Sequence, residues 1–476
     1  MRHVSTVWRA GVFAVLAPTL LSSCLIRALS SSSPTLVAQD IPAGFDFPAD
    51  ENVLLGHVYS ENRQAIREHA WNIWAGLTQQ SRSTHNGNPL PIWETWYSAT
   101  EVFEHRYKTS TEPAPRRTFT RHLEIPKQSV HKTSSRNEIS AAVMSFVKLN
   151  QPAAQFIWDN NYYLRSALDD LNARFNENHA PVEQRQIKPL PRTAVALKIV
   201  FWLIKNSDSP QSKEGLTALP YWDSNYSPPP DGQTPTHLTW PKCVAVDPAG
   251  RYPIGSKRQV TCNGRSGVEA EVVRLNRFYT SRLTTKEDVE NARHFMTVLS
   301  GAGGEQERFV TNQGQIPELN DYIVLCAMHV TTKEMDNWTF QTFWWSPTPD
   351  APPYGDFRTP NVTGVWRNYQ MCTAYSMVTP RTPTGSPHIC FNPYLETDLG
   401  PTKPYAVGSR SYPPDPMAGT RSNCMNCHMR AAWPAPPPTN PANDGYIPPH
   451  YGGLATYVKT DFLWSLVFHS QPQKGK

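Results

Sequence analysis

The stretch DYIVLCAMHVTTKEMDNWTFQTFWW, residues 321–345, contains two apolar runs that predict two β-strands. Both runs, 321–334 and 337–345, are rich in β-branched and aromatic residues, which favour strands. We expect them to be neighbouring strands of one sheet. The segment 193–205, TAVALKIVFWLIK, has a similar composition and predicts a further buried strand. Its two lysines and the preceding Arg192 argue against a membrane span.

Helical periodicity outside these strands indicates a mixed fold. Apolar residues recur at helical spacing in 61–80, with Ser60 as the expected cap, and in 284–301. Segments 160–178 and 452–470 are further helix candidates. The chain has 45 prolines among 476 residues, so long Pro-rich loops are expected. The sequence therefore predicts an α+β body with antiparallel strands, several helices and a helical C-terminal end.

The overall charge gives little indication of a charged partner. The 45 basic and 40 acidic residues leave a formal net charge of +5. The sequence contains no dense run of Lys and Arg, so we expect no nucleic-acid partner.

The N-terminal segment is typical of an export signal. Residues 1–9 are basic, and residues 10–21, AGVFAVLAPTLL, form an apolar run too short to span a bilayer. The run ends in LSSC, which is similar to a bacterial lipoprotein signal with Cys24 as the acylated residue. We expect 1–23 to be the signal peptide and 24–44 a tether. Cleavage after Ala38 is the alternative, and either places the protein in the periplasm or on the outer membrane.

The seven cysteines that follow Cys24 divide into three groups. In an oxidising compartment, sequence neighbours suggest disulfides between Cys243 and Cys262 and between Cys372 and Cys390. Each disulfide would close a loop of nearly twenty residues and stabilise the fold by ~3 kcal/mol. Cys326 lies within an apolar run and is interpreted as a buried free thiol. This pairing leaves the two C-terminal cysteines for a separate role.

Those two cysteines lie in SNCMNCHMRAAWP, residues 422–434, which contains one C-x-x-C-H motif. Two thiols on one helical turn can attach to the vinyl groups of one porphyrin, and the next residue places an imidazole beneath the iron. Ser422 is the expected helix cap. A zinc site would need two more ligands, and a thioredoxin-like pair would follow a strand. A disulfide between Cys424 and Cys427 is a further alternative. We expect one covalent haem c.

At these residues the chain resembles the bacterial c-type cytochromes. The resemblance implies that Cys424 and Cys427 form the thioethers and that His428 is the proximal iron ligand. More loosely, residues 321–345 together with 422–434 look like large monohaem proteins of proteobacteria. Only 48 residues follow His428, and the only methionine among them, Met429, is adjacent on the same helix. We therefore expect 411–476 to be a haem-attachment segment packed on a body formed by 45–410.

The second face of the haem would be covered by this body or left open. His329 is the first candidate for the distal ligand, because it lies in a strand made otherwise of core residues. The alternative is a core histidine bonded to a backbone carbonyl. Met328 is expected to face the other side of the strand. Further candidates for the distal ligand are His294, His450 and Met417.

Three function classes follow from this interpretation. A six-coordinate covalent haem favours electron transfer to a redox partner protein. An open distal site would favour a haem oxidoreductase, peroxidase- or oxidase-like, in which His329 or His294 acts as acid–base on a small-molecule substrate. A haem-containing binding or sensing lipoprotein is the third class.

Overall fold

The structure is a computed structural model. It describes residues 36–85, 87–104, 117, 119, 144–223, 240–297, 315–379, 385–396, 405–407, 410–412, 423–436 and 452–472. The predicted signal peptide, Cys24 and most of the predicted tether lie outside these residues. Within the described residues, none of the helices is both long and apolar enough to cross a bilayer.

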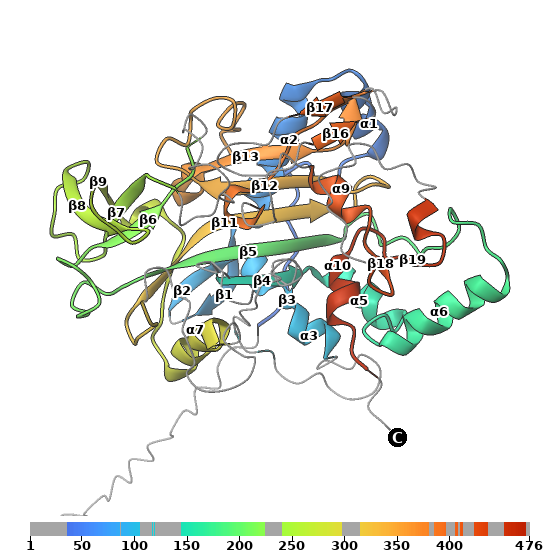
Figure 1. Ribbon diagram of the computed structural model, residues 1–476, viewed down its shortest axis with the longest axis horizontal. Helices are drawn as coiled ribbons and strands as arrows, with labels where there is room; N and C mark the ends of the chain where they lie inside the picture. Colours follow the sequence, from blue (N-terminus) through green and yellow to red (C-terminus); the bar gives the residue numbers. More distant parts are fainter. Residues whose placement is uncertain are drawn as a thin grey trace, which may run out of the picture. The chain divides into compact units, whose positions relative to one another are not determined.

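The described body is α+β, as the sequence predicts (Figure 1). Its central sheet is antiparallel and has the order β13–β12–β11–β5–β4–β3, with β10 paired to the first part of β11. The strands are β3 (Tyr97–Ser98), β4 (Met144–Leu149), β5 (Val195–Ile204), β10 (Thr280–Arg282), β11 (Tyr322–Thr332), β12 (Thr339–Trp345) and β13 (Tyr369–Ala374).

The three strands expected from the apolar runs therefore exist and are neighbours. β11 lies between β5 and β12, in antiparallel register with both. Nearly every residue of these strands is buried, because the sheet is covered on both faces. This double burial explains why the runs are continuously apolar instead of alternating.

Helix α2 (Arg63–Leu77) covers one face of the sheet. Its Trp74 ring stacks on Phe343 of β12 with centroids 4.2 Å apart, and Trp71 contacts the same ring. The helix begins at Asn62, whose side chain accepts from Ala65 N–H, so Ser60 is not its cap. Ser60 instead ends α1 (Glu51–Tyr59), a helix that the periodicity did not predict.

Two short helices among the other described ones, α8 (Pro393–Glu396) and α9 (Cys424–His428), contact β11 and β12. Helix α6 (Arg165–Glu177) confirms the helix expected in 160–178, and α7 (Lys286–Thr297) confirms the one expected in 284–301 as far as the described residues reach. The helices are α3 (Ala99–Phe103), α5 (Gln151–Asp159), α6 (Arg165–Glu177), α7 (Lys286–Thr297), α8 (Pro393–Glu396), α9 (Cys424–His428) and α10 (Trp464–His469).

The prediction of a helix across 452–470 is wrong over most of that segment. Only α10 is an α-helix, and β19 (Val458–Lys459) pairs with β18 (Ala432–Trp433). Asp461 and Phe462 both have positive φ, of 48° and 66°, which breaks any helix between β19 and α10. The strand pairing depends on a distant segment, so local periodicity could not indicate it.

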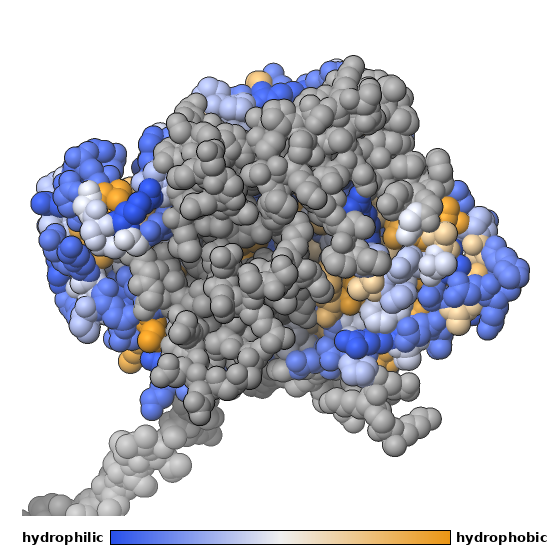
Figure 2. Space-filling model, viewed as in Figure 1, coloured by the Kyte–Doolittle hydropathy of each residue, from blue (hydrophilic) through white to orange (hydrophobic). Residues whose placement is uncertain are grey.

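A second, smaller sheet lies beside the central one (Figure 1). Its order is β6 (Thr217–Pro220), β7 (Cys243–Asp247), β9 (Arg265–Arg274), β8 (Lys257–Cys262), with β7 and β9 parallel. Asn263 and Gly264 turn the β8–β9 hairpin with φ of 53° and 73°, the region such tight turns require. Its visible surface is mostly hydrophilic (Figure 2).

Both predicted disulfides are present. Cys243 is bonded to Cys262, which joins β7 to β8 within the small sheet. Cys372 of β13 is bonded to Cys390, which holds the segment before α8 on the central sheet. Cys326 is a buried free thiol, as expected. The remaining described pairs of short strands are β1 (Gln80–His85) with β2 (Asn88–Pro91), β14 (Val378–Thr379) with β15 (Ser386–Pro387), and β16 (Tyr405–Val407) with β17 (Arg410–Tyr412).

Candidate functional site

The C-x-x-C-H motif forms the short helix α9. Asn423 is its N-cap, with the side-chain oxygen accepting from Met425 N–H at 2.9 Å, so the expected cap Ser422 is one residue too early. After α9 the chain enters β18, where the Trp433 indole donates to the Asp169 carboxylate of α6 at 2.8 Å. These contacts fix α9 at both ends.

His428, the last residue of α9, is oriented by a backbone carbonyl. Its Nδ1 lies 2.7 Å from the Phe462 oxygen, which can only accept, so Nδ1 carries the hydrogen. Nε2 therefore keeps its lone pair. The ring also packs beside Phe340 of β12, with centroids 4.9 Å apart. Burial lowers the pKa of His428 to about 4, so the imidazole is neutral at pH 7 and competent as a metal ligand.

The two cysteines of α9 are both protonated thiols at neutral pH. Burial raises the pKa of Cys427 to about 11, and the nearby Glu396 carboxylate adds to this rise. Burial also raises the pKa of Cys424 well above its usual value. The Cys424 thiol lies 3.4 Å from the Cys390 carbonyl oxygen and 3.9 Å from Cys390 Sγ. The Trp464 indole donates to the Cys427 carbonyl oxygen at 3.2 Å.

A row of polar residues crosses the sheet beneath the C-terminal segment. Lys198, His329, Thr342 and Cys372 are directly opposite one another on β5, β11, β12 and β13. Residues paired in this way project from the same face. That face is opposite to the one covered by α2, because Thr342 and Phe343 are consecutive in β12. The row therefore carries His329 to the side of the sheet where α9 lies.

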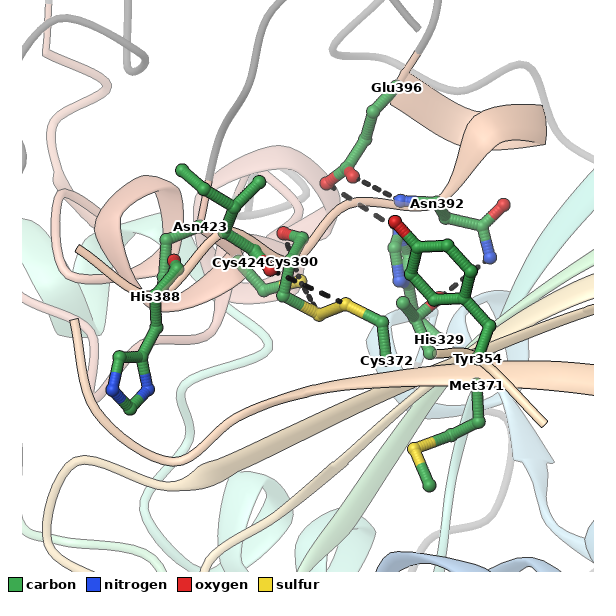
Figure 3. The surroundings of a disulfide bond; sticks show 12 residues. His329, Tyr354, Met371, Cys372, His388, Cys390, Asn392, Glu396, Asn423 and Cys424 are labelled. Carbon is green, nitrogen blue, oxygen red and sulfur yellow. Dashed lines mark hydrogen bonds and ion pairs between the residues drawn. A yellow bond between two sulfur atoms is a disulfide. The ribbon is translucent and has the colours of Figure 1, made fainter. Parts of the chain in front are cut away.

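The segment before α8 docks on this row. The Asn392 amide donates to Thr342 Oγ1 at 2.6 Å and to the Phe343 carbonyl at 3.1 Å. The Asn392 backbone N–H donates to Glu396 Oε2 at 2.5 Å. Figure 3 shows the consequence: Glu396 is directed toward His329, beside the Cys372–Cys390 disulfide and Cys424.

His329 and Glu396 form a buried pair. Nε2 and Oε1 are 4.0 Å apart, and the side chains are 14% and 11% exposed. Burial lowers the pKa of His329 well below its usual value, and the positive charges of Lys198 and of protonated His428 lower it further. Burial raises the pKa of Glu396 to about 7, although the Asn392 N–H and the Lys198 charge act in the opposite direction. At neutral pH this pair can therefore hold one exchangeable proton.

The structure thus brings four of the predicted site residues into one neighbourhood. Cys424, Cys427 and His428 come from α9, and His329 comes from β11, close enough to His428 that a charge on His428 lowers the pKa of His329. Met328 of β11 is directed to the other face, opposite Phe343, as expected. Met417, His450 and the side chain of His294 lie outside the described residues. Helix α7, which carries His294, is well separated from α9 in Figure 1.

Three members of the neighbourhood were not predicted from the sequence. Glu396 lies in a Pro-rich segment without periodicity, and Phe462 contributes only a backbone carbonyl. Lys198 had a usable signal, since a lysine within an apolar strand needs a polar partner. Its direction toward His329 follows from strand register, which the sequence does not specify.

The residues present fit a covalently attached haem. Two thiols on one helical turn, followed by a neutral imidazole with a free Nε2, supply the donors that such a group needs. Among the described residues, no group of three or more His, Cys, Asp and Glu side chains is arranged to hold a metal ion.

Comparisons with known proteins give no relative. No family model matches the chain, no curated protein matches it, and no solved structure matches it.

Proposed function

We propose that this chain is an exported c-type haem protein with one covalent haem, and that its function is electron transfer. The observation that carries the proposal is the hydrogen bond from His428 Nδ1 to the Phe462 carbonyl oxygen at 2.7 Å. Iron-binding histidines commonly donate their second nitrogen to such an acceptor, which fixes the ring and raises ligand basicity. Every neutral imidazole keeps one nitrogen lone pair, and the hydrogen bond at Nδ1 leaves that lone pair on Nε2, the nitrogen available to an iron.

Three of the five residues of α9 have a role in this proposal. The thiols of Cys424 and Cys427 would attach the haem, and His428 would bind its iron. Phe340 and the Phe462 carbonyl hold the imidazole in place. The haem supplies one-electron redox chemistry when bound. His329 is the proposed second residue that would bind the iron, because it projects from the centre of the sheet toward the same region.

A haem-dependent oxidoreductase is the second candidate. The observation that favours it is the His329–Glu396 pair, 4.0 Å apart and buried, with Lys198 nearby. A carboxyl with a pKa of about 7 beside a neutral imidazole is suited to accept and donate protons at neutral pH. In this case His329 acts as acid–base and not as a ligand.

Export is supported by two features. The N-terminal residues have the pattern of a secretion signal, and two disulfides are compatible with an oxidising compartment. We propose a periplasmic or outer-membrane location, with a lipid anchor through Cys24.

An absorption spectrum tests the function. The full chain would be exported in a host with haem-attachment machinery and examined oxidised, reduced and as the pyridine haemochrome. A c-type haemochrome with a sharp low-spin α band is expected. A high-spin spectrum that shifts with peroxide or carbon monoxide would instead select the oxidoreductase. A chain without haem would overturn both candidates.

A further inference from the structure

Cys424 lies in contact with a disulfide that the haem interpretation does not use. Its Sγ is 3.9 Å from Cys390 Sγ, close to van der Waals contact, and Cys390 is bonded to Cys372 (Figure 3). All three cysteines are buried, with exposed fractions of 5%, 0% and 6% for Cys424, Cys390 and Cys372. A free thiol and a disulfide therefore lie buried side by side.

Backbone pairing maintains this contact. Asn423 forms a parallel β-bridge with Cys390. The residue that precedes Cys424 is therefore paired directly with Cys390. The Asn423 amide donates to the His388 carbonyl at 2.6 Å and to the Ser376 carbonyl at 3.1 Å. Asn423 also caps α9, which places Cys424 as the first helical residue. The position of the Cys424 thiol is consequently fixed by the same asparagine that holds both segments together.

The free thiol within the central sheet has no such arrangement. Cys326 of β11 is buried, and its sulfur contacts the Val324 carbonyl of its own strand at 3.7 Å. It therefore serves as a matched control: a buried free cysteine in the same sheet without a disulfide contact of this kind.

We propose that Cys424 and the Cys372–Cys390 disulfide form a thiol–disulfide exchange site in the haem-free chain. The Cys424 thiolate attacks Cys390 Sγ, the Cys390–Cys372 bond breaks, and Cys372 leaves as the thiolate. Cys372 takes up the proton that Cys424 released. One thiol and one disulfide exist before and after the step, so no external oxidant or reductant is needed. The product is a disulfide between Cys390 and Cys424.

The sulfur that is attacked follows from the geometry. Cys424 contacts the Cys390 sulfur, so the expected product joins these two residues and frees Cys372. Because burial keeps the Cys424 thiol protonated, exchange is expected to be slow at neutral pH and faster under mildly alkaline conditions.

The exchange has a consequence that rests on the proposed function. A Cys424 sulfur held in a disulfide cannot form a thioether, and a thioether sulfur cannot attack a disulfide. Haem attachment and exchange would then compete for one sulfur atom. Attachment of haem would fix the Cys372–Cys390 pairing, and the exchanged form would be unable to complete the second thioether.

Disulfide mapping of the haem-free chain tests the exchange. The full chain would be exported in a host without haem-attachment machinery, incubated folded at mildly alkaline pH, quenched with acid, alkylated and digested without reduction. Mass spectrometry should detect a Cys390–Cys424 peptide together with alkylated Cys372. The Cys326→Ser variant should give the same distribution. Cys424→Ser should lose the new peptide completely and keep only Cys372–Cys390.

A second variant tests the proposal independently, in case Cys424→Ser does not fold. In Cys372→Ser, Cys390 has no original partner, and mild oxidation with oxidised glutathione should yield Cys390–Cys424. The proposal is overturned if wild type keeps Cys372–Cys390 intact with Cys424 fully alkylated at all times. It is equally overturned if Cys390 and Cys424 remain two separate thiols in Cys372→Ser. Because no haem is present, either failure leaves the proposed function standing, and a chain that takes up no haem leaves the exchange standing.

Discussion

His428 Nδ1 lies 2.7 Å from the carbonyl oxygen of Phe462, a residue with a positive φ of 66°. The left-handed backbone at this position belongs to the turn that follows β19, and β19 is paired with the strand that follows α9. The segment that contains β19 and Phe462 therefore has two roles. It supplies the carbonyl acceptor for His428, and it pairs with the strand that follows α9. This arrangement couples the orientation of the imidazole to the β18–β19 pairing.

Cys427 is the more exposed of the two candidate haem-attachment cysteines. Replacing Cys427 by Ala should leave haem attached through one thioether or not at all, because one of the two thiols is missing. The pyridine haemochrome band should then shift or disappear. The Cys326→Ala variant, which removes a buried cysteine elsewhere in the sheet, should keep the wild-type band. An unchanged band in Cys427→Ala would end the haem interpretation.

His329 is the proposed second axial ligand. Its replacement by Ala should convert a low-spin spectrum to a high-spin one, because the iron loses its strong-field sixth ligand. His57, a partly exposed residue of α1, provides the control, and His57→Ala should leave the spectrum low-spin. A wild type that is already high-spin would contradict ligation by His329 and favour its role as acid–base.

Glu396 should give the stability a pH dependence of defined sign. Its pKa is about 7 in the folded chain against 4.5 for the ordinary group, so the folded state binds more protons between these values. Its contribution is therefore fully present below about pH 4.5 and is lost as the pH rises through 7. The loss is about 3 kcal/mol, at 1.36 kcal/mol for each pKa unit.

The matched variant for this prediction is Glu396→Gln, which keeps an oxygen for the Asn392 N–H but cannot ionise. The unfolding free energies of wild type and variant would be measured by urea denaturation. As the pH rises, wild type should become less stable relative to the variant. The depressed pKa of His428 affects both proteins and cancels in the difference between their unfolding free energies, whereas His329, which is 4.0 Å from Glu396, contributes to it. A difference that stays constant from pH 4 to 8 would contradict the burial of an ionisable Glu396.

Phe340 fills the space between β12 and the His428 ring. It is 2% exposed, so Phe340→Ala should cost about 3–5 kcal/mol of unfolding free energy through lost burial and a cavity. Ile254 is 68% exposed, and Ile254→Ala should change stability by less than about 0.5 kcal/mol. Chemical denaturation measures both. Equal effects of the two variants would show that the C-terminal segment does not pack on the sheet at this point.

Three strands of the central sheet were predictable, because their burial on both faces produces continuous apolar runs in the sequence, whereas β3, β4, β10 and β13 were not predicted. β5, β11 and β12 all fall within the predicted segments. Helices α2 and α6 were predictable for a similar reason, since each has its apolar residues at helical spacing. Helix α1 was missed because its apolar residues are not concentrated on one side.

The C-terminal segment 452–470 shows the limit of this approach. Its composition favours a helix, but Val458 pairs with Trp433 and the chain reverses at Asp461 and Phe462. The energy of that pairing comes from residues far away in the sequence. A local pattern contains no information about it.

The sequence by itself determined the α+β class, the central strands, the two disulfide pairs and the C-x-x-C-H motif, because each depends on residues close together or on residue type. The tertiary structure alone decided what surrounds that motif. The proximity of His329 to His428, the pairing of His329 with Glu396, the Phe462 acceptor and the contact between Cys424 and Cys390 all join segments that are distant along the chain. These contacts are set by strand register and by the docking of Asn392 and Asn423 on the sheet, which are long-range packing interactions that no single segment specifies.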